Sequence, residues 1–370
     1  MRALLLSAYA AQSHRHWQHS LQQMFPDWQW TDLSLPPRHF SWRVRGNPLH
    51  WGLAERQTLE RGYQLLIATS MVDLATLRGL VPALARIPSL LYFHENQFEF
   101  PQDRQQHGLL EAQMVSLYSA LAADALAFNS AYNRDSFLQG CENLLGRLPD
   151  YVPAGIVAGL RARATVLPVP LPPLEPVTDP GWPPRPTVGT LRILWSARFE
   201  HDKGGRGLEL ILQGLERAGL DYQLALTGQQ FRSAPAVFSR IRENFSHRLV
   251  QFGFVASAAR YRALQSGADL VLSTADHEFQ GLAVMEAVAA GCVPVVPDRL
   301  AYRELYPQYC RYQSRPQQRE LEADSAVALI RQMAVKKPLP PEMDQYSLSA
   351  LRPRYSALLQ SLQDSQSPPS

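Results

Sequence analysis

One stretch decides the fold. It reads Asp269-Leu-Val-Leu-Ser-Thr-Ala-Asp-His-Glu-Phe-Gln-Gly-Leu-Ala-Val-Met-Glu-Ala-Val-Ala-Ala-Gly-Cys-Val-Pro-Val-Val296. Its pattern predicts an apolar strand over 269–272, a polar loop, a helix over 281–290 and a second strand over 293–296. Strand, helix and strand in this order are the repeating unit of a parallel α/β sheet. The stretch therefore predicts the α/β fold class.

Two glutamates in this stretch, Glu278 and Glu286, stand eight residues apart. The first lies in the loop before the predicted helix and the second about two turns into it. Backbone N–H groups at the helix start, around Gln280, Gly281 and Leu282, lack intrahelical partners and attract phosphate or sugar oxygens. The two carboxylates can accept hydrogen bonds from a polyhydroxyl ligand. Taken alone, the pair also fits a solvated loop residue and a charge on a helix face.

A second motif lies about eighty residues upstream, in Leu191-Arg-Ile-Leu-Trp-Ser-Ala-Arg-Phe-Glu-His-Asp-Lys-Gly204. Together with the glutamate pair and Gly291-Cys-Val-Pro-Val-Val296, it resembles the retaining glycosyltransferases of family 4. The resemblance implies a GT-B fold, a nucleotide-sugar donor, and Arg198 and Lys203 holding the donor diphosphate, where the leaving group gathers charge. Ala197 stands where that family usually has glycine, and it still permits a tight turn.

Length and composition agree with two α/β domains. The chain has 370 residues, of which 46% are hydrophobic and 19% charged, enough for two sizeable cores. Cys141, Cys292 and Cys310 show neither paired nor metal-ligand spacing, so we expect buried thiols in a reducing, cytoplasmic compartment. The apolar run near Met1 is too short for a signal peptide, and no stretch reaches the roughly 18 apolar residues of a membrane helix. Only the tail 364–370 is expected to be disordered.

The expected organisation is two Rossmann-like, doubly wound parallel-sheet domains that face each other across a cleft. We expect an acceptor-side domain over 1–170 and a proline-rich linker over 171–188. A nucleotide-sugar-binding domain over 189–340 follows, and a helix with a tail over 341–370 crosses back to the first domain. The other expected elements are strands at 3–7, 65–69, 89–93, 125–129, 191–196, 222–227 and 249–252, and helices at 105–122 and 347–362.

The first half has three polar clusters, each following a predicted strand. They are Ser13-His-Arg-His-Trp17, His94-Glu-Asn-Gln-Phe-Glu-Phe-Pro101 and Asn129-Ser-Ala-Tyr-Asn133. Ligands of parallel α/β sheets bind beyond the carboxyl ends of strands, so we expect the clusters to share one edge. They resemble a branch of family 4, the tRNA-queuosine α-mannosyltransferases. Two departures are the absence of paired glycines in the first turn, before Ser13, and Phe100 where the branch usually has tyrosine.

This resemblance implies roles for single residues. His94, Glu278, Arg198 and Lys203 would be catalytic. The donor would be bound by a larger set, namely Arg198, Lys203, Glu278, Gln280, Gly281, Leu282, Glu286 and Ser13. The acceptor would be bound by His14, Glu95, Asn96 and Gln97. The simpler interpretations are a capping or core imidazole for His94, solvated cations for Arg198 and Lys203, and a polar turn for residues 95–97.

For the remaining cluster residues a structural role is favoured. Asn129, Ser130 and Asn133 are typical of a capped helix start, and Tyr132 is expected to pack.

The implied reaction moves mannose from GDP-mannose to the cyclopentenediol of queuosine in a tRNA anticodon, with retention of configuration. GT-B enzymes generally need no metal, so neither a metal nor another cofactor is expected beside GDP-mannose. Two alternatives stay open. One is a family 4 enzyme with another nucleotide sugar and a lipid, polysaccharide or small-molecule acceptor, although no convincing basic amphipathic helix for a membrane is found. The other is a non-catalytic nucleotide-sugar or RNA-binding protein, which the intact charged motif argues against.

Charge supports an RNA acceptor only weakly, because the formal net charge is +3 and the isoelectric point about 8.8. Basic groups occur locally at Arg38, Arg43 and Arg45 near Trp42, at Arg161 and Arg163, and at Arg299 and Arg303. The segment 38–45 has the composition of an RNA-contacting loop, and it equally fits a solvated loop. The sequence does not indicate an oligomeric state.

Overall fold

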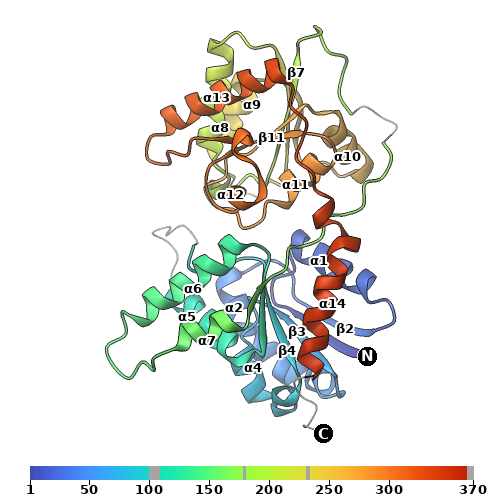
Figure 1. Ribbon diagram of the computed structural model, residues 1–370, viewed down its shortest axis with the longest axis vertical. Helices are drawn as coiled ribbons and strands as arrows, with labels where there is room; N and C mark the ends of the chain where they lie inside the picture. The colour runs from blue at the N-terminus through green and yellow to red at the C-terminus, as the bar shows by residue number, and fades with distance from the viewer. Residues whose placement is uncertain (100–108, 178–180, 231–233, 365–370) are drawn as a thin grey trace. The chain divides into compact units, whose positions relative to one another are not determined.

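The computed structural model describes residues 1–99, 109–177, 181–230 and 234–364 (Figure 1). The contacts divide the chain into two compact units, Met1–Pro170 with Leu348–Ser370, and Leu171–Ser347. Each unit contains a six-stranded sheet whose strand pairs are parallel. The expected tail beyond 364 and the first part of the expected helix at 105–122 lie outside the described residues.

The first unit is ordered β2-β1-β3-β4-β5-β6. Its inner strands are apolar on both faces, as parallel strands covered by helices must be; every residue of β3 is buried. In Figure 1, α5, α6 and α7 lie on one side of this sheet and α1 and α14 on the other. The strands are β1 (Arg2–Ser7), β2 (Gln29–Ser34), β3 (Leu65–Thr69), β4 (Ser89–Phe93), β5 (Ala125–Phe128) and β6 (Ala164–Val166). The helices are α1 (Gln12–Met24), α2 (Phe40–Ala54), α3 (Arg56–Leu59), α4 (Leu74–Leu80), η1 (Pro82–Arg86), α5 (Leu109–Ala122), α6 (Ala131–Leu145), α7 (Ile156–Ala162) and α14 (Leu348–Asp364).

The second unit is ordered β12-β11-β10-β7-β8-β9. Figure 1 shows α8, α9 and α13 on one side of its sheet and α10 and α11 on the other. The strands are β7 (Leu191–Ser196), β8 (Tyr222–Thr227), β9 (Leu249–Gly253), β10 (Leu270–Leu272), β11 (Val293–Pro297) and β12 (Arg311–Tyr312). The helices are η2 (His201–Lys203), α8 (Gly205–Arg217), α9 (Ala236–Asn244), α10 (Ala258–Gly267), α11 (Leu282–Ala289), α12 (Tyr302–Leu305), η3 (Gln308–Cys310), α13 (Arg319–Lys336) and η4 (Asp344–Tyr346).

The strand order identifies where each sheet can hold a ligand. In the first sheet the chain reverses its direction of winding between the neighbours β1 and β3, and in the second between β7 and β10. Loops at the carboxyl ends of two such strands diverge and leave room for a ligand. The predicted site motifs follow β1 and β4 in the first unit, and β7 and β10 in the second.

Three strands were missed. β2 is a half-exposed edge strand with the polar sequence Gln29-Trp-Thr-Asp-Leu-Ser34, whereas β6 and β12 have three and two residues. Such short or polar edges lack the apolar run that predicts a strand. The other strand predictions are confirmed to within two residues, and the three cysteines are confirmed as buried free thiols.

The proline-rich segment 171–188 belongs to the second unit. Trp182 is buried there, and its Nε1 atom donates a hydrogen bond to the carbonyl of Leu264. Arg185 forms an ion pair with Asp269 at 2.6 Å. Its described residues, 171–177 and 181–188, form no helix and no extended strand because of their prolines, yet these side chains attach it to the sheet. It is packed chain and not a free spacer.

Helix α14 packs on the first unit, to which the contacts assign it. The buried Tyr355 hydroxyl accepts a hydrogen bond from Trp17 Nε1 at 3.0 Å and donates one to the carbonyl of Pro168 at 3.0 Å. The buried face of the helix consists of Leu351, Tyr355, Leu359 and Leu362. None of the helices within the described ranges is long and apolar enough to cross a membrane.

Candidate active site

The loops after β7 and β10 are joined by backbone hydrogen bonds. The carbonyl of Asp202 accepts from the N–H groups of Asp276 at 2.8 Å and His277 at 3.2 Å. Because β7 and β10 are the neighbours where the winding reverses, this junction lies where a ligand is expected. The two motifs that the sequence places far apart therefore form one structure.

Lys203 is the charged centre of this junction. Its side chain is buried, and Nζ donates to the carbonyl of His277 at 2.9 Å. Nζ also lies 3.0 Å from Asp202 Oδ2 and 3.3 Å from Glu278 Oε2. Burial acts to lower the pKa of Lys203, but the carboxylates of Glu278 and Asp202 outweigh it and raise the pKa. Lys203 is thus a permanent cation and not a solvated one. Asp202 was missed as a site residue, although it stands inside the quoted motif.

The glycine after Lys203 is required by the close approach of two loops. Gly204 has a φ of +69°, and a Cβ atom there would lie 1.8 Å from the carbonyl oxygen of Thr274. The hydroxyl of Thr274 donates to the carbonyl of Lys203 at 2.9 Å. Only a residue without a side chain fits both the backbone angle and the contact.

Arg198 is the second cation of this edge, and its side chain is 48% exposed. It forms an ion pair with Glu200 at 3.0 Å. Burial raises the pKa of Glu200, while Arg198 opposes that rise. An exposed guanidinium with one carboxylate partner can exchange that partner for a phosphate at little cost.

Glu278 precedes the start of α11, which begins one residue later than predicted. Its Oε1 atom accepts from the N–H of Phe279 at 3.1 Å. Gly281 caps the helix with a φ of +75°, so the first N–H groups, including that of Leu282, have no partner within the helix. The Gln280 side chain is buried and contacts Met285 Sδ, so only its backbone is suited to a ligand.

Glu286 lies in the second turn of α11. Gln265 donates to its Oε2 atom at 3.4 Å. Burial raises the pKa of Glu286 to about 7, and the hydrogen bond from Gln265 opposes the rise. A carboxyl group with one weak donor retains accepting capacity for hydroxyl groups.

In the first unit, the rings of His14 and His94 contact each other at an interplanar angle of 35°. Their ring centroids are 4.0 Å apart, and His14 Nε2 lies 3.6 Å from Glu95 Oε1. Ser13 Oγ lies 3.5 Å from His14 Nδ1. The structure thus brings together residues that follow β1 and β4.

His94 is buried against aromatic rings and not solvated. Trp17 contacts its ring edge-on at 5.0 Å, and Tyr92 lies at 4.8 Å. Burial, and then the neighbouring His14 and His16, lower the pKa of His94 well below its ordinary value. Its Nε2 atom is buried and has no hydrogen-bond partner within the described part of the chain. A neutral imidazole with a free ring nitrogen results.

Asn96 and Gln97 are engaged inside the unit. Asn96 Nδ2 donates to Asn133 Oδ1 at 2.9 Å and to Ser136 Oγ at 3.0 Å. Gln97 is buried and contacts Met71 Sδ. Both amides help to hold the loop that carries Glu95 in place.

The cluster after β5 is a helix start, as predicted. Ser130 caps α6 by accepting from the N–H of Asn133 at 3.0 Å. Asn133 also donates to the carbonyl of Phe93, and Asn129 donates to that of His94. Tyr132 does more than pack, because its hydroxyl donates to Glu99. These residues fix the backbone of β4 where His94 leaves it.

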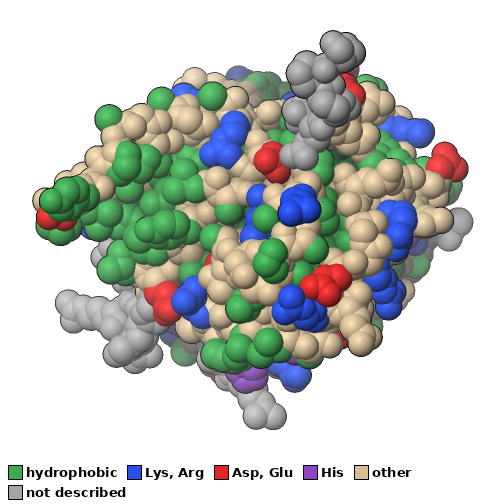
Figure 2. Space-filling view, turned by 90° about the horizontal axis from the view of Figure 1, so that it is seen from below, with side chains coloured by type: hydrophobic (Ala, Val, Ile, Leu, Met, Phe, Trp, Pro, Cys, Tyr) green, Lys and Arg blue, Asp and Glu red, His purple; other side chains and the backbone are tan. Residues whose placement is uncertain are grey.

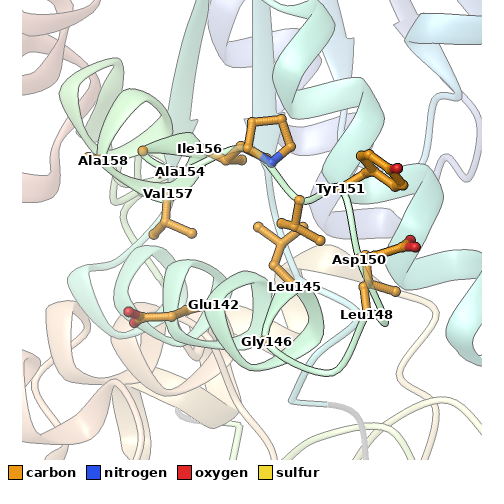
Figure 3. A pocket seen from close by; sticks show the side chains of 13 residues that line it. Glu142, Leu145, Gly146, Leu148, Asp150, Tyr151, Ala154, Ile156, Val157 and Ala158 are labelled. Carbon is orange, nitrogen blue, oxygen red and sulfur yellow. The ribbon is translucent and has the colours of Figure 1, made fainter.

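A separate hollow of about 730 Å³ lies between the end of α6 and the start of α7 (Figure 3). Its labelled side chains include the apolar Leu145, Leu148 and Val157, and its only carboxylates are Glu142 and Asp150. It contains none of the predicted site residues and has no group suited to a diphosphate. The hollow therefore does not coincide with the candidate site. Within the described residues, no three His, Cys, Asp or Glu side chains are arranged to hold a metal ion.

Comparison with known proteins identifies the family of the chain. A family model described as "tRNA-queuosine alpha-mannosyltransferase N-terminal" matches residues 2–171, and one described as "Family 4 Glycosyltransferase in conflict systems" matches 158–299. The chain is 32% identical over 287 residues to the tRNA-queuosine alpha-mannosyltransferase of Drosophila melanogaster, covering 75% of this chain and 74% of that protein.

Solved structures agree on the fold. The sucrose-phosphate synthase of Thermosynechococcus elongatus matches with a TM-score of 0.65 and 13% identity, covering 99% of this chain and 100% of that one. The Anabaena protein Alr3699/HepE, solved in complex with UDP, matches with a TM-score of 0.60 and 14% identity, covering 98% and 100%. These likenesses show the GT-B fold that the sequence predicted. With that fold and the match to the Drosophila protein, the chain belongs to the tRNA-queuosine alpha-mannosyltransferase family.

Proposed function

We propose that the protein transfers mannose from GDP-mannose to the cyclopentenediol of queuosine in a tRNA anticodon, with retention of configuration, in the cytoplasm. The observation that carries this proposal is the family match over residues 2–171, because it covers the whole sheet of the first unit, which would take the acceptor. The second unit supports it with two cations and two carboxylates at the point where its sheet reverses.

The donor diphosphate would bind beside Lys203 and Arg198. The buried Lys203 is already held as a cation by Glu278 and Asp202, and the exposed Arg198 can release Glu200 for a phosphate oxygen. Fixed cations of this kind stabilise the charge that builds on a departing phosphate. N–H groups of Gln280, Gly281 and Leu282 at the α11 start would add hydrogen bonds.

The two carboxylates would bind hydroxyl groups. Glu278 would accept from the mannose, because it stands next to the predicted diphosphate site through its contact with Lys203. Glu286 would accept from the nucleotide ribose. Gln265 donates only a long hydrogen bond of 3.4 Å to its carboxyl group, which can therefore also accept from a ribose diol.

In the proposed step the bond between mannose C1 and the diphosphate oxygen breaks, and a bond from C1 to the acceptor oxygen forms on the same face. The acceptor proton passes to an oxygen of the leaving GDP, so no base from the chain is needed. His94 would donate or accept a hydrogen bond at the transferring sugar through its unpartnered Nε2 atom. Its lowered pKa favours the neutral form. GDP-mannose is the co-substrate of this scheme, which requires no resident cofactor.

On the acceptor side, His14 and Glu95 would contact the cyclopentenediol. Their 3.6 Å separation places a donor and an acceptor together beside His94. Asn96 and Gln97 would position Glu95 through their buried contacts. Ser13 would contact the donor from the first turn of α1.

The test uses purified protein, GDP-[14C]mannose, and tRNA from cells with and without queuosine. Label only in the queuosine-containing tRNA is the expected result. Label in both tRNA samples would reject the proposed acceptor. So would label in neither sample if GDP is slowly released without RNA. The second outcome would leave a glycosyltransferase with a different acceptor.

A further inference from the structure

The segment that joins β2 to α2 is basic and has no acidic residue. From residue 33 to residue 54 the chain has three arginines and two histidines but neither Asp nor Glu. These are Arg38, His39, Arg43, Arg45 and His50. The structure shows that residues from Phe40 onward are helical and not a loop. Their position in the first unit decides what this charge can do.

The structure places the start of α2 at the same sheet edge as His14. After β2, the N–H of Leu35 donates to the carbonyl of Ser7, the last residue of β1. Tyr9, which follows β1, meets Phe40 at the start of α2 with ring centroids 6.1 Å apart. The basic segment therefore lies beside the loop that leads from β1 into α1, the helix that carries His14.

A buried asparagine fixes α2 in this position. Asn47 Nδ2 donates to the carbonyl of Met71 at 3.2 Å, and Asn47 Oδ1 accepts from the N–H of Asp73 at 3.2 Å. Met71 and Asp73 follow β3, the strand between β1 and β4. The start of α2 is thus tied to this edge from a second side.

Trp42 is held flat on α2 with one face open. Its side chain is 57% exposed. A Cβ atom on Gly46, one turn later, would lie 2.5 Å from the indole, so the ring rests directly on the helix backbone. A rigid aromatic ring with a free face suits stacking of a nucleobase.

The three arginines near Trp42 differ in whether a carboxylate is paired with them. No acidic side chain of the described residues forms an ion pair with Arg38 or Arg43, and Arg43 Nε only donates to the carbonyl of Pro36. Arg45 is paired with Asp73 and Glu111. Of the other candidates, Arg161 is paired with Asp135, Arg299 with Glu322 and Asp276, and Arg303 with Asp298. Arg163 donates to the carbonyls of Ala123 and Gly159.

On the face drawn in the space-filling view of Figure 2, hydrophobic side chains gather on one side, and basic side chains are interspersed with acidic ones. Acidic neighbours offset part of the attraction of such basic groups for a polyanion.

We infer that Trp42, Arg38 and Arg43 form a contact surface for a single-stranded loop of the acceptor RNA. A base stacks on the exposed indole, and the two guanidinium groups bind backbone phosphates. The inference rests on the proposed function and names a part of the chain that recognises the RNA rather than the sugar. Queuosine lies in an anticodon loop, so a platform at the edge that carries His14 would hold the neighbouring nucleotides.

The first experiment measures the affinity of Trp42→Ala for queuosine-containing tRNA by fluorescence anisotropy, and the KM for that tRNA in mannose transfer. Loss of one stacked base predicts about a tenfold weaker Kd and higher KM, with kcat retained. Release of GDP from GDP-mannose without RNA should equal the wild-type rate, because Trp42 is not one of the proposed donor residues. Trp42→Phe should recover most of the affinity, since it keeps a stacking ring.

The second experiment measures Arg38→Gln over a series of salt concentrations. One lost phosphate contact lowers the slope of log Kd against log salt by about one. Gly46→Ala should weaken binding as Trp42→Ala does, because the added Cβ displaces the indole.

The matched controls are Tyr151→Ala, an aromatic residue 97% exposed between α6 and α7, and Leu53→Ala, 66% exposed at the end of α2. Both should bind tRNA as the wild type does. Wild-type affinity in Trp42→Ala, or an equal loss in Tyr151→Ala, would overturn the inference. If the wild type binds the tRNA but transfers no mannose, and Trp42→Ala weakens that binding, the RNA-contact surface would be retained and the proposed reaction rejected.

Discussion

The ammonium group of Lys203 lies 3.3 Å from the carboxylate of Glu278, a residue 75 positions later in the chain. This ion pair joins the loop after β7 to the loop after β10, where the winding of the second sheet reverses. Its two members come from the two motifs by which the sequence resembles the glycosyltransferases. Each of them therefore has a structural partner in addition to its proposed ligand.

Lys203→Met should reduce mannose transfer at least about a hundredfold, because the cation that stabilises the negative charge of the leaving diphosphate is lost. It should also destabilise the protein by about 3–5 kcal/mol, since the carboxylates of Asp202 and Glu278 lose their buried cation. Steady-state kinetics and thermal unfolding measure the two effects. In the double variant with Glu278→Gln, part of the stability should return but no activity. Full activity in Lys203→Met would contradict the assignment of the donor site.

Glu278→Gln should lower kcat by roughly a hundredfold while the melting temperature changes little. The amide oxygen can still accept from Lys203, which keeps Asp202 as a partner, but the negative charge toward the sugar hydroxyls is lost. Kinetics with GDP-mannose and differential scanning calorimetry give the two values. An unchanged kcat would show that Glu278 does not contact the reacting sugar.

Gly204→Ala should unfold at a markedly lower temperature, with a loss of at least about 2 kcal/mol. A Cβ atom there meets the Thr274 carbonyl at 1.8 Å and demands a positive φ. Gly62→Ala is the matched control, because Gly62 has a φ of +74° and nothing within 4 Å of a Cβ atom. Gly62→Ala therefore measures the cost of the positive φ alone, which is about 1 kcal/mol. Equal melting temperatures for the two variants would show that the loops can move apart.

The KM for GDP-mannose should depend on pH through the ionisation of Glu286. Its pKa of about 7 means that the carboxyl group is largely protonated at pH 6. Ribose hydroxyl groups donate best to the ionised form, so the KM for GDP-mannose should fall as the pH rises from 6 to 8. Glu286→Gln should have a higher KM that no longer changes over this range. A pH-dependent KM that persists in the variant would exclude Glu286 as its source.

The raised pKa of Glu286 also predicts how the free energy of unfolding depends on pH. As the pH rises, the Glu286 carboxyl group ionises near pH 4.5 in the unfolded chain but only near pH 7 in the folded protein. Wild-type stability is therefore lost as the pH rises from about 4.5 through about 7. Glu286→Gln should gain stability over the wild type across this window, by no more than about 3 kcal/mol. Unfolding in urea at pH 5 and pH 8 measures the difference, and the opposite trend would refute it.

Tyr355→Phe should weaken the attachment of α14 by about 1–3 kcal/mol, because Trp17 Nε1 loses its acceptor in a buried site. Tyr309→Phe is the control, since its half-exposed hydroxyl makes only a 3.4 Å hydrogen bond. Thermal unfolding compares the two. Because Trp17 also contacts the His94 ring, transfer should fall in Tyr355→Phe and not in Tyr309→Phe.

The sequence alone determined the inner strands and the charged motif. Strands such as β3 and β7 are continuous apolar runs because both their faces are covered, and such runs can be recognised without knowing the neighbours. Lys203, Glu278 and His94 stand directly after strands, which predicts their position at the carboxyl edge of a sheet. Both properties depend on residues close together along the chain.

Only the tertiary structure decided which partners these residues have. It showed that Asp202 and Glu278 share the buried Lys203, that Asn96 is used by Asn133, and that segment 171–188 packs on the second unit. It also brought Trp42 to the edge that carries His14, through contacts of Phe40 with Tyr9. Apart from the contact between the neighbours Asp202 and Lys203, these contacts join residues distant in sequence, and the strand order of each sheet, not any local pattern, brings them together.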